Sequence, residues 1–237
     1  MREFGIGQSL PRTEDLRLVR GQGRYTDDVV PPQSARMFIL RSHHASARIR
    51  DVNMDAALES PGVLGILTGA DAHRAGLRGF TSLVRKTGPD GNPNFEPEFA
   101  VIAHDLVRYA GEPVAIVIAE TLNEAKSAAE LIEIDYEELP CVADLADADS
   151  EDAPAVWPEC PDNLCVLTEV GDRAAADAAF AGAAHVSRVD FRISRVAVAP
   201  MEARNAIGEW SDAEQRFTLH AGIQNPHMSR DQLAHVF

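Results

Sequence analysis

Residues 111–138 read GEPVAIVIAETLNEAKSAAELIEIDYEE, and this stretch decides the fold of the chain around it. The run Val114–Ala119 is wholly apolar, which is typical of a buried strand. Thr121 and Glu124 form a capping box, in which each side chain accepts the backbone N–H of the other residue at the start of a helix. Apolar and acidic residues then alternate from Ile132 to Glu137, as in a strand with one wet face. The stretch therefore predicts a strand, a helix and a second strand.

The composition is that of a soluble globular protein with one large or two modest domains. The chain has 237 residues, of which 45% are hydrophobic and 25% are charged, and its formal net charge is −15. A balance this acidic disfavours nucleic acid as a partner unless a local basic patch exists. Because the sequence holds no apolar run of about 18 residues and no export signal, we expect no membrane partner and a cytoplasmic location.

The hydrophobic pattern predicts further short elements around this block. Strands are expected at 37–40, 47–52, 63–68, 186–193, 205–210 and 216–219. Helices are expected at 55–58, at 173–180 after the cap Asp172, and from Asn225-Pro226 onward with Met228, Leu233 and Val236 inward. Residues 1–35, 85–98 and 139–162 are rich in turn-forming residues and predict an arm, a loop and a linker.

The residue types that bind metals show none of the required spacings. Cys141, Cys160 and Cys165 include no Cys-x2-Cys pair and no fourth thiol, so we expect no iron–sulfur cluster in this chain. His43 and His44 are adjacent, and on a strand they would face opposite sides, which excludes their joint binding of one metal. A small metal-dependent enzyme that uses histidines is the third and weakest hypothesis for the function.

Nine motifs follow one another along the chain. The first five are Arg12-x-Glu14-Asp15, Gly21-x-Gly23-x-Tyr25-x-x-Asp28, Arg41-Ser42-x-His44-Ala45-x-Ala47-Arg48-Ile49, Pro61-Gly62-Val63 and Val107-Arg108-Tyr109-x-Gly111-Glu112-Pro113-Val114-Ala115. The last four are Asp135-Tyr136-Glu137-x-Leu139-Pro140, Gly171-Asp172, Met201-Glu202-x-Arg204 and Gln224-Asn225-Pro226-His227. In this order the chain resembles the N-terminal part of the molybdopterin-binding large subunit of the xanthine dehydrogenase, aldehyde oxidase and carbon monoxide dehydrogenase family.

The resemblance implies a fold and its boundaries. The class is α+β, with an α/β-hammerhead domain followed by the beginning of an α/β molybdopterin-binding domain. The implied segments are an N-terminal arm at 1–16, the hammerhead at 17–140, a linker at 141–165 and the incomplete molybdopterin-binding domain at 166–237.

The resemblance also assigns a role to one residue. Gln224 matches the family's glutamine that donates a hydrogen bond to the apical oxo group on molybdenum, a place where a neutral donor stabilises charge without becoming a ligand. Ile223 and Ala203 stand where the family usually has Thr and Pro. The family's general-base Glu belongs to a downstream Gly-x-Gly-Glu motif that this sequence lacks. The chain is therefore expected to supply no catalytic residue and no metal ligand, and to be inactive alone.

The family's reaction inserts water-derived oxygen into a C–H bond or oxidises carbon monoxide. The implied cofactor is molybdopterin, as molybdopterin cytosine dinucleotide, held mainly by segments outside this chain. The implied partners are the remainder of the large subunit, an iron–sulfur subunit with a 2Fe-2S cluster and a flavin subunit with FAD. The alternative hypothesis is a non-catalytic hammerhead module that serves in assembly or interaction.

Overall fold

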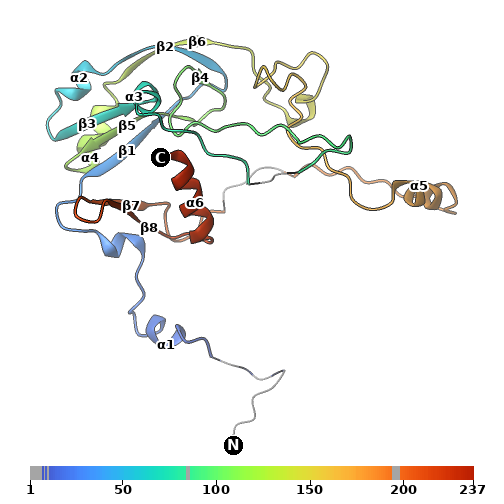
Figure 1. Ribbon diagram of the computed structural model, residues 1–237, viewed down its shortest axis with the longest axis horizontal. Helices are drawn as coiled ribbons and strands as arrows, with labels where there is room; N and C mark the ends of the chain where they lie inside the picture. The colour runs from blue at the N-terminus through green and yellow to red at the C-terminus, as the bar shows by residue number, and fades with distance from the viewer. Residues whose placement is uncertain (1–6, 8, 10, 84–85, 194–197) are drawn as a thin grey trace, which may run out of the picture. The chain divides into compact units, whose positions relative to one another are not determined.

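The computed structural model describes residues 7, 9, 11–83, 86–193 and 198–237 (Figure 1). The chain forms two compact units, and each of them joins two separate stretches of sequence. The first unit combines the described residues up to Ser34 with Ile193–Gln224, and the second combines Ala35–Arg192 with Asn225–Phe237. Both units contain helices and antiparallel strands, which confirms the predicted α+β class.

The second unit is built on an antiparallel sheet with the predicted apolar strand at its centre. Strand β5 (Pro113–Ala119) lies between β1 (Arg36–Arg41) and β3 (Val63–Thr68). Val117 and Ala119 on β5 have no exposed surface. A strand that is hydrogen-bonded on both edges and covered on its faces needs apolar residues at nearly every position, as its sequence has.

Helix α4 (Leu122–Ala129) packs against β1 and β5 of this sheet (Figure 1). The predicted capping box is confirmed, because Glu124 N–H donates to Thr121 Oγ1 (3.2 Å) and Thr121 N–H donates to Glu124 Oε2 (2.9 Å). The buried face of the helix consists of Ala125, Ala128 and Ala129. Since alanine side chains are small, the helix backbone can approach the sheet closely.

A second antiparallel sheet places β2 (Ala47–Asn53) between β4 (Leu106–Val107) and β6 (Glu133–Glu138). The predicted alternation in β6 is confirmed. Ile134 and Tyr136 pack against a small buried cluster, whereas the acidic residues that alternate with them are largely exposed. This sheet therefore has one apolar face and one polar face.

Two short helices flank the first sheet. Helix α2 (Asp55–Leu58) contacts β3 and α4, and its Ala57 is fully buried. Helix α3 (Gly69–Arg74) begins directly after β3 at a point where a Cβ on Gly69 would overlap the carbonyl group of Ala103. Glycine is required there because of this close backbone approach.

The remainder of the second unit is mostly irregular. It contains a 3-10 turn, η2 (Leu145–Asp147), and helix α5 (Arg173–Ala181), whose predicted cap Asp172 accepts the N–H of Ala175 at 2.9 Å. Residues 144–163 fold back on themselves, because the Asn163 amide donates to the carbonyls of Ala148 and Pro154. The predicted linker thus contains ordered local structure.

The strand predicted at 186–193 is wrong. These residues are described, and none of them belongs to a strand. Val186, Val189, Phe191 and Ile193 are between 53% and 89% exposed. Alternation indicates a strand only where another strand supplies hydrogen-bond partners and a core covers the apolar face, and the described residues supply neither here.

The first unit contains helix α1 (Asp15–Leu18), a 3-10 turn η1 (Thr26–Val29) and a β-hairpin. The hairpin pairs β7 (Ala206–Ser211) with β8 (Arg216–Ala221), which confirms the two strands predicted on either side of a turn near Asp212. Across the strands, the rings of Trp210 and Phe217 lie 4.5 Å apart. No helix among the described residues is both long and apolar enough to cross a membrane.

Candidate functional site

Gln224 lies just beyond strand β8, at the end of the first unit. The β7–β8 ladder ends at the pair Ala206 and Ala221, and Gly222, Ile223 and Gln224 continue as an exposed segment. Among the described residues, the Gln224 side chain has no hydrogen-bond partner. An amide that is exposed and uncommitted can donate two hydrogen bonds to a ligand.

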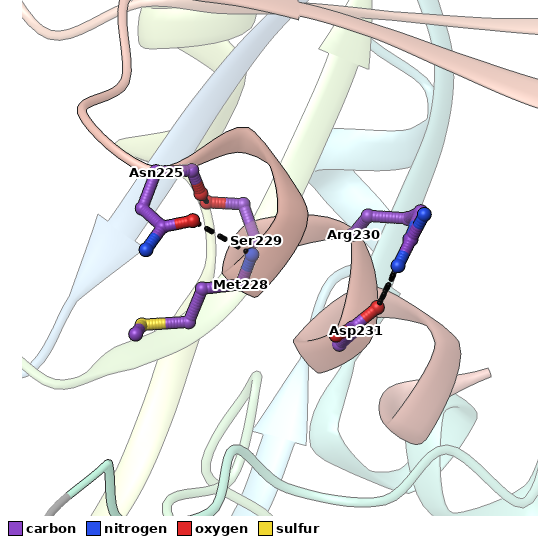
Figure 2. Close-up of polar contacts among 5 residues, drawn as sticks. All are labelled: Asn225, Met228, Ser229, Arg230 and Asp231. Atoms are coloured by element: carbon purple, nitrogen blue, oxygen red, sulfur yellow. Dashed lines mark hydrogen bonds and ion pairs between the residues drawn. The ribbon is translucent and has the colours of Figure 1, made fainter.

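The residues after Gln224 begin helix α6 (Pro226–Val236) of the second unit. The predicted cap is confirmed: Asn225 Oδ1 accepts the N–H of Met228 at 3.1 Å, and Ser229 Oγ donates to the Asn225 carbonyl at 3.0 Å (Figure 2). Val236 is buried, but Met228 is 42% exposed rather than inward as predicted. In the motif Gln224-Asn225-Pro226-His227, Asn225 and Pro226 thus start a helix, and the exposed side chain of Gln224 takes no part in capping it.

The motif Met201-Glu202-x-Arg204 contributes to the same unit through Glu202. Its Oε1 atom accepts hydrogen bonds from the N–H and the hydroxyl of Thr26, at 3.1 and 3.3 Å. A pocket of about 400 Å³ opens beside this contact, between the η1 turn and the end of β8. Local sequence patterns do not predict this pairing, because Thr26 and Glu202 are 176 residues apart in the sequence. The motif stretch that starts at Arg195 lies outside the described residues as far as Ala197.

The motifs that contain Ser42 and Glu112 hydrogen-bond to each other and have a structural role. The Ser42 N–H donates to the Glu112 carbonyl at 2.9 Å, and Gly111 N–H donates to the Ser42 carbonyl at 2.8 Å. The Glu112 side chain is 4% exposed and accepts the Arg108 N–H at 2.6 Å. Burial raises the pKa of the Glu112 carboxyl above its ordinary value. The sequence signal for this role is Gly111-Glu112-Pro113. These residues are typical of a turn, and the Glu112 carboxylate can accept a backbone N–H near that turn.

The expectation that His43 and His44 face opposite sides of a strand is wrong. They follow the end of β1, and their ring centroids lie 4.1 Å apart. His44 also lies 4.6 Å from the Tyr136 ring, so the pair packs on a neighbouring aromatic side chain. Among the described residues, no group of three or more His, Cys, Asp or Glu side chains is placed to hold a metal ion.

The cysteines differ in their surroundings. Cys141 is exposed, whereas Cys160 is buried. Burial first, and then the hydrogen bond to Asp162, raises the pKa of the Cys160 thiol to about 11. A thiol with so high a pKa is protonated at neutral pH and is a poor nucleophile. Cys160 therefore has a packing role.

Comparison with known families identifies the chain. Residues 20–140 match the family described as "Aldehyde oxidase and xanthine dehydrogenase, a/b hammerhead domain". Residues 156–237 match the "Molybdopterin cofactor-binding domain". The chain belongs to the aldehyde oxidase and xanthine dehydrogenase family, as its nine motifs predicted, and its fold is a hammerhead domain followed by the start of a molybdopterin-binding domain. The second match disfavours a module that consists of a hammerhead alone.

Individual relatives agree with this assignment. The chain is 34% identical over 224 residues to the nicotine 6-hydroxylase large subunit of Paenarthrobacter nicotinovorans, a match that covers 94% of the chain and 26% of that relative. It is 32% identical over 238 residues to the carbon monoxide dehydrogenase large chain of Afipia carboxidovorans, covering 95% of the chain and 28% of that relative.

Solved structures share the fold. Quinoline 2-oxidoreductase from Pseudomonas putida 86 superposes with a TM-score of 0.80 at 30% identity, over 98% of the chain and 28% of that structure. The Cu,Mo-CO dehydrogenase superposes with a TM-score of 0.81 at 30% identity, over 98% of the chain and 29% of that structure. The chain thus spans between 26% and 29% of the length of these four relatives.

Beyond the end of β8, one side chain has the chemistry that holding a molybdopterin group would need. Gln224 offers an uncommitted neutral donor within the stretch that matches the cofactor-binding domain. A neutral amide can hydrogen-bond a negatively charged oxygen without replacing a metal ligand. The fit is limited to this one side chain of the chain's described part.

Proposed function

We propose that this chain is part of a molybdenum hydroxylase, in which it contributes the hammerhead domain and the segment that carries Gln224. The reaction is insertion of water-derived oxygen into a C–H bond of the substrate, or oxidation of carbon monoxide. The observation that carries the proposal is the free Gln224 amide at the end of β8, inside a stretch that matches a molybdopterin cofactor-binding domain.

In this proposal Gln224 holds the cofactor through its side-chain amide. The Nε2 group would donate a hydrogen bond to an oxygen atom of the bound group, where negative charge develops. When bound, the molybdenum cofactor supplies the two-electron oxidation chemistry. Because the amide does not titrate at ordinary pH, it would donate this hydrogen bond as a neutral group and move no proton itself.

We further propose the chemical form of the cofactor and the identity of the partner chains. The cofactor is molybdopterin cytosine dinucleotide, and the partners are the remainder of the molybdenum subunit, a 2Fe-2S subunit and an FAD subunit, in the cytoplasm. The names of the relatives support a multi-subunit assembly, since they include a large subunit, a large chain and a "complex subunit gamma". The spacing of the cysteines, with no Cys-x2-Cys pair, supports an iron–sulfur cluster on another chain.

The proposed segments are an arm at 1–16, a hammerhead at 17–140, a linker at 141–165 and a molybdopterin-binding segment at 166–237. The family matches at 20–140 and 156–237 support this division. The two compact units have other boundaries. The first joins the described residues up to Ser34 with Ile193–Gln224, and the second joins Ala35–Arg192 with Asn225–Phe237.

A Gln224→Ala variant of the assembled enzyme tests the proposal. We expect the anaerobic reduction of the enzyme by its substrate to slow by about 10-fold or more, since one hydrogen bond to the cofactor is lost. The probes are carbon monoxide, nicotine and an aromatic aldehyde, and the readout is bleaching of the visible absorbance in a single turnover.

The control is Gln22→Ala, which removes another exposed glutamine whose side chain has no hydrogen-bond partner among the described residues. Its reduction rate and molybdenum content should equal those of the unmodified enzyme. A Gln224→Ala enzyme that contains its molybdenum and is reduced at the normal rate would refute the role given to Gln224.

A further inference from the structure

Glu202 links the η1 turn to the strand end that precedes Gln224. Its Oε1 atom accepts the N–H of Thr26 at 3.1 Å and the Thr26 hydroxyl at 3.3 Å. Both carboxylate oxygens also lie near Gly222: a Cβ built on this glycine would stand 3.2 Å from Oε2 and 3.7 Å from Oε1. One carboxylate therefore binds Thr26 and lies beside a residue that is two positions from Gln224.

The segment after β8 has little else to hold it. The β7–β8 ladder ends at Ala221, and beyond that ladder Gly222, Ile223 and Gln224 form no backbone hydrogen bond among the described residues. All three residues are exposed. The position of Gln224 thus depends on how the chain leaves the strand and on the cap of helix α6 at Asn225, and Glu202 lies near the residue where the chain leaves the strand.

We infer that Glu202 is a positioning residue, which fixes the direction of the 222–224 segment and thereby the place of the Gln224 amide. The inference rests on the proposed function of Gln224. Two features support the role. The carboxylate is half-buried and takes two hydrogen bonds from Thr26, which itself is 8% exposed. Gly222 leaves the space beside the carboxylate free of a side chain, since a Cβ there would stand 3.2 Å from Oε2.

A double-mutant cycle in the assembled enzyme separates positioning from a merely structural role. Glu202→Ala should slow reduction by substrate by about 10-fold, a typical effect for a residue that orients a cofactor-binding group. In the Gln224→Ala background the same change should have almost no further effect, because Glu202 acts through Gln224. A merely structural loss would instead multiply the two effects.

Hydrogen exchange gives a readout that does not depend on activity. In Glu202→Ala, the backbone amide of Thr26 should exchange faster because it loses its acceptor, while the molybdenum content stays unchanged. Glu202→Gln should restore slow exchange and most of the rate, since the amide oxygen can still accept the Thr26 N–H. Glu214→Gln is the matched control, because Glu214 lies in the turn at the opposite end of the same hairpin.

A milder variant covers the case in which Glu202→Ala does not assemble. Thr26→Val removes the hydroxyl donor, keeps the backbone donor and preserves the side-chain shape. It should therefore slow reduction by substrate less than Glu202→Ala does. This slowing should again be absent in the Gln224→Ala background. A normal rate or additive effects in both Glu202→Ala and Thr26→Val would overturn the inference and leave the role of Gln224 standing. A normal rate in Gln224→Ala alone would overturn the proposed function and the inference with it.

Discussion

Two carboxylates in the second unit show how the surroundings of a single residue set its charge. Glu112 is buried, and burial raises the pKa of its carboxyl above the ordinary 4.5. Asp71 accepts the N–H and the hydroxyl of Thr68 at 2.8 Å each, and these bonds lower its pKa below the ordinary 3.8. Both side chains accept a backbone N–H, so desolvation decides the difference.

The stability of Glu112→Gln and Asp71→Asn should depend on pH in opposite ways. Folding favours the protonated form of Glu112, so the wild-type chain gains stability over Glu112→Gln as pH falls through the raised pKa toward 4.5. Folding favours the charged form of Asp71, so its advantage over Asn is present above pH 3.8 and is lost as pH falls further. Urea unfolding of the full chain from about pH 2 to 8 measures both differences. Differences that run in parallel with pH would contradict the assigned causes.

At the scale of elements, local sequence signals placed most helices and strands correctly. The capping boxes and caps at Thr121, Asp172 and Asn225 each begin a helix where predicted. These signals succeed because the hydrogen bonds they describe form within four residues and need no other part of the chain.

Thr121→Ala should destabilise the chain by about 1 kcal/mol, because the first turn of α4 loses the acceptor for the Glu124 N–H. Ser127→Ala in the same helix is the control, since Ser127 is exposed and its side chain has no hydrogen bond among the described residues. It should change the free energy of unfolding by less than about 0.5 kcal/mol. If urea unfolding shows the same loss of stability in both variants, the Thr121 cap makes no specific contribution to the free energy of unfolding.

At the scale of the molecule, the described chain has more apolar surface than its own core covers. Phe191 and Ile193 are more than 80% exposed, and helix α5 has no buried residue. The chain spans 26% of the length of the nicotine 6-hydroxylase large subunit. We propose that further polypeptide of the enzyme covers these side chains and completes the cofactor site.

The purified 237-residue chain should accordingly hold far less than one molybdenum atom per molecule and show no hydroxylase activity. The physical reason is that one hydrogen bond, worth about 1 kcal/mol net, cannot retain a cofactor by itself. Mass spectrometry of the metal after gel filtration measures the content, with the assembled enzyme as the reference. Stoichiometric molybdenum with turnover in the isolated chain would disprove this expectation.

Part of the site could be predicted from the sequence, and part could not. The motif around Gln224 predicts this residue as the cofactor-binding one, and that assignment stays a prediction; the structure places Gln224 just beyond an exposed strand end with a free amide. Its anchor was not predicted, because the contact between Thr26 and Glu202 joins positions 176 residues apart. The local sequence around Thr26 does not indicate Glu202, and the local sequence around Glu202 does not indicate Thr26.

Local sequence is enough to predict the elements whose stabilising contacts are local or depend on one apolar face, above all the strand, helix and strand of residues 113–138. Which alternating stretch becomes a strand depends on its tertiary partners: 206–211 is a strand because 216–221 pairs with it, and 186–193 is not. The tertiary structure also decides that Glu112 is buried and that Glu202 meets Thr26. Strand pairing, burial and long-range hydrogen bonds depend on partners that the local sequence does not contain.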